Sequence, residues 1–352
     1  MRRALMSLCR LFLPDAGLRR YANALCVVVA TNLLTALVFY QHGGGERTTR
    51  NWVGPQPYSS SRNCTQLYNL NRPDYSFLYR ASSSPPSPSL PAVFVITPTH
   101  TCTTQKVDLT SLCQTLSLVP KLTWIVVEDS RTKTKLVSHL LSKCMVESVH
   151  LSVATSTKYK SSLPWPLYRM FGTVRGVEQR NAGLRWLREN YHPKNSSGVV
   201  YFIDDDNKID VRLFSEIRKT KEVSVFNVGF AGGVYYEGPV CGEDGRVREW
   251  HSPSAEWSIW ASSRKIPIDM AGFAVNLHLI LARPEVLIGR DVRGADSRVG
   301  QLETDLLEHF TTRERLECRG SNSEVLVWHT KTADPNLKHE FHYPSDRASV
   351  AV

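Results

Sequence analysis

The sequence predicts an α/β protein built on a mostly parallel, doubly wound sheet. From residue 92 onward, short apolar runs rich in β-branched residues alternate with longer segments that have one apolar face. This order is typical of parallel strands joined by crossover helices. Two of the apolar runs end in acidic residues, which places polar side chains along one edge of the sheet.

The apolar runs predict four strands, and the segments between them predict three helices. The strands are residues 92–97, 124–127, 149–153 and 199–203, and the helices are residues 107–119, 133–144 and 174–189. We expect Pro98 to end the first strand, because proline has no backbone N–H group to donate to a neighbouring strand. After about Phe214 the pattern becomes mixed, with one further helix from Leu302 to Phe310.

The length and charge of the chain limit its class. With 352 residues, it can bury the core of one large domain or of two small ones. The formal net charge is +10, yet the Lys and Arg residues are dispersed and form no basic stripe with interleaved aromatics. We therefore expect no nucleic acid partner, and an acidic or phosphorylated substrate explains the charge equally well.

The N-terminal region predicts a membrane anchor. Residues 21–40 are uncharged and largely apolar, and five arginines precede them. This asymmetry predicts a cytosolic tail at 1–20, a type II transmembrane anchor at 21–40, a stem at 41–91 and a lumenal domain at 92–352. A cleaved signal peptide is the alternative, and the length of the segment and the lack of a clear cleavage site disfavour it.

Two further features favour a lumenal domain. Asn63 and Asn195 each begin an N-glycosylation sequon. Six cysteines follow the predicted anchor without the paired spacing of a zinc site. In an oxidising compartment they predict one or two disulfides or buried thiols, and the sequence leaves the pairing open.

The acidic triplet Asp204, Asp205 and Asp206 directly follows the predicted strand 199–203. Crowded carboxylates are unfavourable unless a positive charge lies among them. A divalent cation prefers such oxygen ligands, so the triplet indicates a metal-bridged phosphate site, as in enzymes that use nucleotide-diphosphate sugars. The alternative is that these aspartates form a turn or cap a helix.

Four segments resemble one family closely. They are EQRNAGLRWLRE at 178–189, DDDN at 204–207, PIDMAGFAVNL at 267–277 and VLVWHTKT at 325–332. They resemble the β1,3-glucuronosyltransferases of glycosyltransferase family 43, in order, from about residue 93 to 338. The resemblance implies a nucleotide-diphosphosugar transferase (GT-A-like) fold, with a donor half at 92–206 and an acceptor half at 207–352. It also implies Mn²⁺, UDP-glucuronic acid, inversion at the anomeric carbon and a homodimer in the Golgi membrane.

The resemblance assigns the metal and part of the donor site. Asp206 matches the metal ligand, and Asp205 matches a contact to ribose or to an outer-shell water, whereas Asp204 belongs either to the donor site or to the structural frame. Asp129 matches the carboxylate that accepts a hydrogen bond from uracil. Without the resemblance, Asp129 reads as a cap of the helix that follows it.

The remaining donor residues are basic. The resemblance places Arg175 and Arg180 at the donor, with Arg180 on the glucuronate carboxylate, although their spacing alone favours surface helix residues. His329 and Lys331 match residues near the diphosphate and the donor sugar. Lys331 replaces an arginine of the family, and His100 replaces a tyrosine that stacks on uracil, so these two positions leave the choice of donor open.

The acceptor side of the resemblance is carried by a carboxylate base and four contact residues. Glu303 matches the catalytic base, which would remove the proton from the 3-hydroxyl of a terminal β-galactose. A negative charge in the first turn of a helix is the alternative role of Glu303. The acceptor contacts that the resemblance implies are Glu237, Trp260, Arg264 and Asp269.

The sequence thus predicts glucuronyl transfer to a galactose-terminated glycan, as in the linker between glycosaminoglycan and protein. Three alternatives stay open: N-acetyllactosamine-type acceptors, another UDP-sugar as donor, and a lumenal carbohydrate-binding protein without turnover.

Overall fold

The computed structural model describes residues 90–156, 175–252, 264–289, 293–294, 297, 301–320 and 322–338. All of them belong to the second of two units of the chain, Asp74–Val352. Within these described ranges, no helix has both the length and the apolar character needed to cross a bilayer. The predicted anchor at 21–40, the predicted stem up to residue 89, Asn63 and Trp260 lie outside the described residues.

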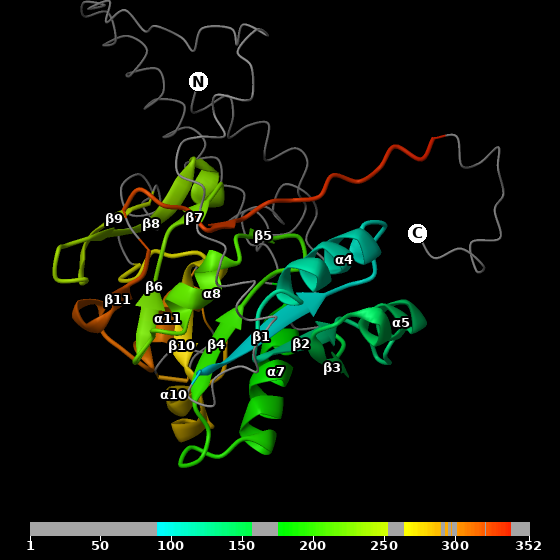
Figure 1. Cartoon of the computed structure of the whole chain (residues 1–352), viewed down its shortest axis with the longest axis horizontal. Coiled ribbons are helices and arrows are strands. Elements are labelled where there is room, and N and C mark those ends of the chain that lie inside the picture. The colour runs from blue at the N-terminus through cyan, green and yellow to red at the C-terminus, as the bar shows by residue number, and fades with distance from the viewer. Residues whose placement is uncertain are drawn as a thin grey trace, which may run out of the picture. The chain divides into compact units, whose positions relative to one another are not determined.

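A seven-stranded sheet forms the centre of this unit, in the order β11-β6-β10-β4-β1-β2-β3 (Figure 1). Its strands are β1 Ala92–Thr99, β2 Leu122–Glu128, β3 Glu147–Ser152, β4 Gly198–Phe202, β6 Val223–Val225, β10 Phe273–Asn276 and β11 Glu317–Cys318. The pairs β1–β2, β2–β3, β1–β4 and β6–β11 are parallel, and only β10 runs antiparallel to its neighbours. The predicted mostly parallel sheet is therefore confirmed, and strands from both predicted halves of the domain contribute to it.

The order of the strands changes direction at β1. The chain adds β2 and β3 on one side of β1 and then returns to place β4 on the other side. The carboxyl ends of β1 and β4 therefore lie next to each other at a topological switch point, where open α/β sheets bind their ligands.

The prediction that Pro98 ends the first strand is wrong. β1 continues to Thr99, and Pro98 pairs with Val127 of β2. On its other side, β1 pairs with β4 only as far as Ile96. Pro98 is accommodated because the strand has only one neighbour at this point. On the open side there is no described strand to which a backbone N–H group could donate, so proline costs no hydrogen bond there.

Helices cover both faces of the sheet (Figure 1). α4 Gln105–Leu116, α5 Lys135–Lys143 and α8 Arg212–Ile217 pack against one face, and α7 Val177–Asn190, α10 Leu277–Ala282 and α11 Leu302–Glu308 against the other. Alternate residues of β1 enter the two cores: Val93 and Val95 face α4, whereas Phe94 and Ile96 face α7. The predicted helices are thus present, with ends shifted by up to three residues.

Helix α7 approaches the sheet closely at Gly183. A Cβ atom at this position would lie 2.7 Å from Cγ2 of Ile96 in β1, which is far shorter than a van der Waals contact. A glycine here allows α7 to pack tightly on β1, and this packing sets the position of the first turn of α7 beside the end of β1.

A second, smaller sheet has the order β5-β12-β7-β8-β9. Its strands are β5 Lys208–Ile209, β7 Val228–Gly229, β8 Tyr236–Cys241, β9 Val247–His251 and β12 Val327–Trp328. The disulfide Cys241–Cys318 joins β8 of this sheet to β11 of the main sheet, and Cys113–Cys144 joins α4 to the residue after α5. The expected disulfides are present, and Cys102 belongs to neither.

Candidate active site

The acidic triplet forms the turn that follows β4. The backbone N–H of Asp204 donates to Oδ1 of Asn207 (2.9 Å), and the N–H of Asn207 donates to the carbonyl of Asp204 (3.1 Å). Asn207 is buried, so the hydrogen bonds that stabilise this turn are made by a buried side chain. The next element is β5 rather than a helix, so the helix-cap interpretation is wrong; the aspartates form a turn, and a metal site at this turn stays a prediction.

The three carboxylates have different surroundings. Arg180 Nη2 donates to Oδ1 of Asp204, and Thr99 Oγ1, at the end of β1, donates to Oδ2 of Asp205 (2.7 Å). The backbone carbonyl of Asp206 accepts from the hydroxyl of Thr330. Burial raises the pKa of Asp205 to about 6 despite the hydrogen bond from Thr99, and burial with the nearby Asp204 raises the pKa of Asp206.

These carboxylates fit a divalent cation. The raised pKa values of Asp205 and Asp206 mean that burial and the neighbouring carboxylates outweigh the positive charges near them, such as that of His329 beside Asp206, and a cation would offset this effect. Among the described residues, no group of three or more His, Cys, Asp or Glu is placed to hold a metal ion by itself. Asp206 is the residue that would hold such a cation, since hard divalent ions prefer carboxylate oxygens.

Arg180 is a buried residue in the first turn of α7. Only 6% of it is exposed, and its Nη1 donates to the carbonyl of Arg175 (3.1 Å) while its Nη2 contacts Asp204. The prediction from spacing that Arg180 is a surface residue is therefore wrong. Arg175 is exposed and precedes α7, which begins after the left-handed Gly176 (φ 78°). Because Arg175 lies in a loop, its position relative to Arg180 is not fixed by the spacing of residues along a helix.

Asp269 and His329 form an ion pair between segments 60 residues apart. His329 Nδ1 lies 3.2 Å from Oδ2 of Asp269, whose Oδ1 accepts from the N–H of Ala271 (2.9 Å) at the start of the short helix η5 Met270–Gly272. The hydrogen bond to Asp269 raises the pKa of His329 to about 9. Burial alone would raise the pKa of Asp269, but the hydrogen bond and the charge of His329 lower it overall.

Glu303 lies in the first turn of α11 and pairs with Arg264. Arg264 Nη2 donates to Oε2 of Glu303 (3.0 Å) and to the carbonyl of Ile268 (2.8 Å). Burial raises the pKa of Glu303, and the charge of Arg264 opposes that rise. A carboxylate with a raised pKa is a better general base than an ordinary glutamate, provided that it stays ionised.

The charged pairs belong to one cluster. The charges of Asp269 and Arg180 act on Glu303, that of Arg180 acts on Asp269, and those of Asp204 and Asp206 act on His329. Residues predicted for the metal, the donor, the acceptor and the base are thus brought together, although Arg180 and His329 are 149 positions apart in the sequence.

Asp129 lies beside this cluster, at the end of β2. Its Oδ1 accepts from the N–H of Thr155 (2.6 Å) and its Oδ2 from the Thr155 hydroxyl (2.7 Å), and its own N–H donates to the carbonyl of Thr99 (2.7 Å). The helix-cap interpretation of Asp129 is wrong, because Thr134 caps α5 by accepting from the N–H of Val137. Sequence analysis missed Thr99 and Thr155, whose only signal is a hydroxyl at the end of a strand.

Four other predicted residues remain, and of these His100 has a charge that acts on Asp205. His100 and Lys331 are exposed, one residue beyond β1 and three beyond β12. Glu237 is buried in β8 and accepts a hydrogen bond from the hydroxyl of Ser252. Asn195 is exposed in the turn before β4, as a glycosylation sequon requires.

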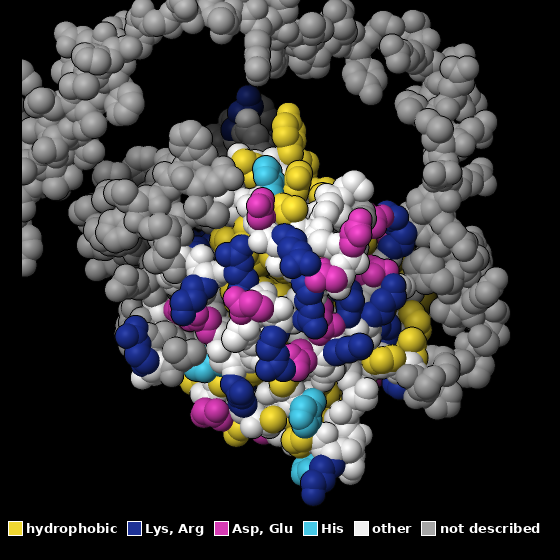
Figure 2. Space-filling view, turned by 90° about the vertical axis from the view of Figure 1, so that its left-hand side faces the viewer, with side chains coloured by type: hydrophobic (Ala, Val, Ile, Leu, Met, Phe, Trp, Pro, Cys, Tyr) yellow, Lys and Arg dark blue, Asp and Glu magenta, His cyan; other side chains and the backbone are white. Residues whose placement is uncertain are grey.

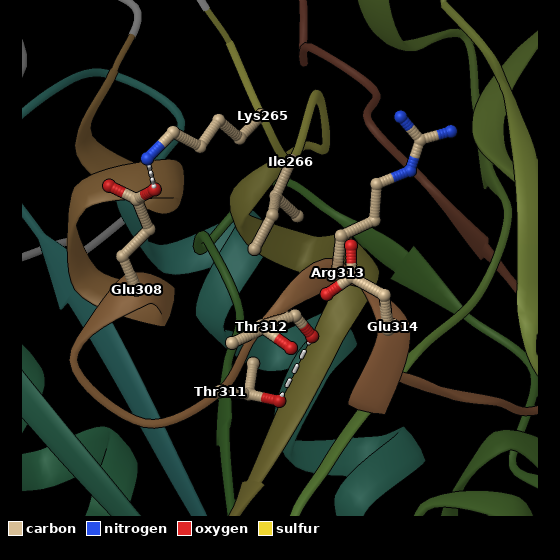
Figure 3. A pocket seen from close by; sticks show the side chains of 7 residues that line it. All are labelled: Lys265, Ile266, Glu308, Thr311, Thr312, Arg313 and Glu314. Atoms are coloured by element: carbon tan, nitrogen blue, oxygen red, sulfur yellow. Dashed lines mark hydrogen bonds and ion pairs between the residues drawn. The ribbon is translucent and has the colours of Figure 1, made fainter.

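A separate hollow of about 460 Å³ lies beyond the C-terminal end of α11 (Figure 3). Its lining contains none of the predicted site residues: Lys265, Ile266, Glu308, Thr311, Thr312, Arg313 and Glu314. Lys265 Nζ lies 2.6 Å from Oε1 of Glu308, so this wall carries an ion pair of its own. Lys265 directly follows Arg264 in the sequence. The Lys265–Glu308 ion pair is therefore a suitable control for the Arg264–Glu303 ion pair.

Carboxylates at the switch point of a doubly wound sheet, a buried arginine and a general-base candidate are features of an enzyme active site. Comparison with known proteins gives the family. The model of glycosyltransferase family 43 matches residues 112–333, and the chain belongs to this family. The resemblance seen in the sequence is therefore confirmed.

Similar curated proteins carry one activity in their names. The chain is 42% identical over 269 residues to the dog galactosylgalactosylxylosylprotein 3-beta-glucuronosyltransferase 2, covering 76% of each chain. It is 38% identical over 315 residues to the human galactosylgalactosylxylosylprotein 3-beta-glucuronosyltransferase 1, covering 88% of this chain and 89% of the relative. Among solved structures, Staphylococcus aureus TarS 1–349 in complex with UDP matches with a TM-score of 0.40 and 16% identity over 73% of both chains.

Proposed function

We propose that this protein transfers glucuronic acid from UDP-glucuronic acid to the 3-hydroxyl of a terminal β-galactose, with inversion and with Mn²⁺ as cofactor. The acceptor is the galactose that ends the linker between a glycosaminoglycan and its protein. The names of the relatives support the transferred sugar and the acceptor. The observation that carries the proposal is the single charged cluster in which Glu303 lies with Arg180, Asp204 and Asp269.

Glu303 is the base in this proposal. It accepts the proton of the 3-hydroxyl while that oxygen forms a bond to the anomeric carbon and the bond from that carbon to UDP breaks. The reaction needs Glu303 in its charged form, and the charge of Arg264 favours that form against the effect of burial. Only one carboxylate is required, because UDP leaves as an anion and needs no proton.

The donor is held by the other half of the cluster. Asp206 would hold Mn²⁺, and the bound ion would supply positive charge for the diphosphate. Asp129, fixed by Thr155, offers its carboxylate oxygens to the uracil N–H group, and Arg180 provides positive charge for the glucuronate carboxylate. His329, kept protonated by Asp269, places a second positive charge beside the diphosphate.

We also propose that the chain acts in the Golgi lumen as a single-pass type II membrane protein and as a homodimer. The apolar segment at 21–40 and the arginines before it support the anchor. The sequon at the exposed Asn195 supports a lumenal domain.

The test is a transfer assay with the full chain in detergent, Mn²⁺ and a panel of UDP-sugars. The acceptors are a galactosyl-galactosyl-xylose glycan and an N-acetyllactosamine glycan, and the product is identified by mass spectrometry and by the linkage in its NMR spectrum. A product with one β1,3-linked glucuronic acid on the first acceptor supports the proposal. Transfer of another sugar would instead assign a changed donor specificity to His100 and Lys331.

Two variants locate the base. Glu303→Gln removes the carboxylate but keeps its size, so it should abolish transfer and leave UDP binding intact. Glu308→Gln is the matched control on the same helix, because its carboxylate pairs with Lys265 outside the cluster (Figure 3). Transfer that survives in Glu303→Gln would show that the base has been misassigned.

A further inference from the structure

Gln179 is a buried polar side chain in the first turn of α7 that the proposed reaction does not use. Only 1% of it is exposed. Its Nε2 donates to the carbonyl of Val153 (2.8 Å) and to the hydroxyl of Thr155 (3.2 Å), and both of these residues follow β3. Gln179 thus connects the start of α7 with the segment that bonds to Asp129.

The hydrogen bonds from Gln179 through Thr155 to Asp129 have a single possible direction. A carboxylate only accepts hydrogen bonds, so the Thr155 hydroxyl donates its one hydrogen to Oδ2 of Asp129 (2.7 Å). The oxygen of that hydroxyl can then only accept, and the amide of Gln179 is its donor. A side chain without an N–H group at position 179 would leave this oxygen and the Val153 carbonyl without that donor.

The carbonyl end of the Gln179 amide has no such partner. Its Oε1 is buried and accepts no hydrogen bond from the residues that the structure describes. A buried acceptor without a donor is unfavourable for folding, and it calls for an explanation in a native structure. A functional need for the N–H₂ group at the other end of the same amide provides one.

The first turn of α7 also reaches the acidic turn after β4. The next residue, Arg180, contacts Asp204, whereas Gln179 reaches the end of β3. In the sheet, β1 and β2 lie between β4 and β3. This turn of α7 therefore links the carboxylate proposed for the nucleotide base with the aspartates proposed for the diphosphate.

Charged side chains on the surface offer a less selective means of recognition. On the face that carries β9 and β11, Lys and Arg side chains alternate with Asp and Glu (Figure 2), and Arg248 pairs there with Asp244 (2.8 Å). A surface with charges of both signs favours no single class of charged ligand. A buried side chain with fixed partners, such as Gln179, can instead distinguish ligands by their hydrogen-bonding groups.

We propose that Gln179 is a positioning residue for recognition of the nucleotide base, and this proposal rests on the proposed function. Through Thr155, it fixes the carboxylate of Asp129 so that uracil is favoured over cytosine. N3 of uracil carries a hydrogen that a carboxylate can accept, whereas N3 of cytosine has a lone pair that a carboxylate repels. A carboxylate that is free to rotate would lose much of this selection, because it would no longer be held in the orientation that the base requires.

The test compares binding of UDP and CDP to the full chain in detergent with Mn²⁺, measured by calorimetry. The wild type should bind UDP more tightly than CDP. Gln179→Met keeps the length of the side chain but removes its donors, so it should weaken UDP binding about three- to tenfold, the effect of one hydrogen bond, and leave CDP binding unchanged. In the transfer assay, the same variant should raise KM for UDP-glucuronic acid and leave kcat nearly unchanged, because the base lies away from the reacting atoms.

Asn181→Leu is the matched control, because Asn181 is another buried amide of α7. Its side chain donates to the carbonyl of Ile288 and accepts from the N–H of Ile288, both at 2.9 Å, so it has no part in the bonds to Asp129. This variant should lower the Tm and keep the preference for UDP. Equal weakening of UDP and CDP binding in Gln179→Met, or no change in either, would overturn the proposal.

Thr155→Val provides an independent variant if Gln179→Met does not fold. It removes the hydroxyl between Gln179 and Asp129 but keeps the backbone N–H that donates to Oδ1 of Asp129 (2.6 Å). The preference for UDP should narrow in this variant too, and an unchanged preference would contradict the role of Gln179.

Binding of UDP needs neither an acceptor nor a sugar on the nucleotide, and this separates the proposal from the proposed function. A preference for UDP that narrows in Gln179→Met supports the role of Gln179 whichever sugar the enzyme transfers. A wild-type chain that transfers glucuronic acid but binds UDP and CDP equally overturns this proposal and leaves the proposed reaction in place.

Discussion

Removal of the positive charge of Arg264 should shift the acid limb of the pH–activity profile to higher pH. Arg264 Nη2 lies 3.0 Å from Oε2 of Glu303, and the two side chains are 13% and 17% exposed. Burial raises the pKa of Glu303, and Arg264 counteracts that rise. In Arg264→Met the pKa of Glu303 therefore rises further, so a larger fraction of the base is protonated at any pH below it.

The size of the effect follows from the geometry. Two unit charges about 3 Å apart attract each other by about 5 kcal/mol at an effective dielectric constant of about 20. Partial exposure and solvent screening reduce this to about 1.4–2.8 kcal/mol, which corresponds to a shift of about one to two pH units. We expect the acid limb of kcat/KM against pH to move upward by that amount, with most of the activity recovered at high pH.

The assay is transfer of glucuronic acid measured at intervals of half a pH unit. Arg264→Lys keeps the charge and should show a smaller shift. Lys265→Met is the control, because it removes the neighbouring ion pair with Glu308, whose distance is 2.6 Å, and should leave the limb in place. An unchanged acid limb in Arg264→Met would refute the reasoning, either because Glu303 is not the base or because Arg264 does not control its charge.

Three further predictions follow from the structure. Asp206→Asn should abolish Mn²⁺-dependent binding of UDP in calorimetry, and a chelator should stop turnover of the wild type until Mn²⁺ is added; full activity in chelator would contradict the metal site. The ion pair of His329 with Asp269 should stabilise the fold fully below about pH 6.5, the ordinary pKa of histidine, and lose that contribution as the pH rises through about 9. Because the His329 side chain is 47% exposed, solvent screening limits the contribution to under about 1 kcal/mol. Thermal unfolding of the wild type and of His329→Asn between pH 6 and 10 measures it, and a constant difference in Tm would contradict it. Replacement of Cys113 and Cys144 by serine should lower the free energy of unfolding by about 3–4 kcal/mol, since the disulfide closes a loop with a sequence separation of 31, and denaturant unfolding without loss of UDP binding checks this.

Local pattern was sufficient for the elements of the main sheet that precede the site. The runs at 92–97, 124–127 and 199–203 are strands because apolar β-branched residues favour burial in a parallel sheet, and this preference acts within a few residues. The end of β1 was predicted too early, because whether a proline ends a strand depends on which neighbours that strand has. The strand β10 was not predicted from the pattern, since four residues carry too little periodicity to distinguish a strand from a loop.

The sequence by itself determined the alternation of strands and helices, the acidic turn at 204–206 and, through its motifs, the family. These are properties of short segments, and they can be recognised without knowing what packs against those segments. Only the tertiary structure decided that Thr99 bonds to Asp205 across a separation of 106 residues and that Arg264 bonds to Glu303 across 39. Such partners depend on the order of the strands and on which face each helix covers, and long-range packing of the whole core determines both.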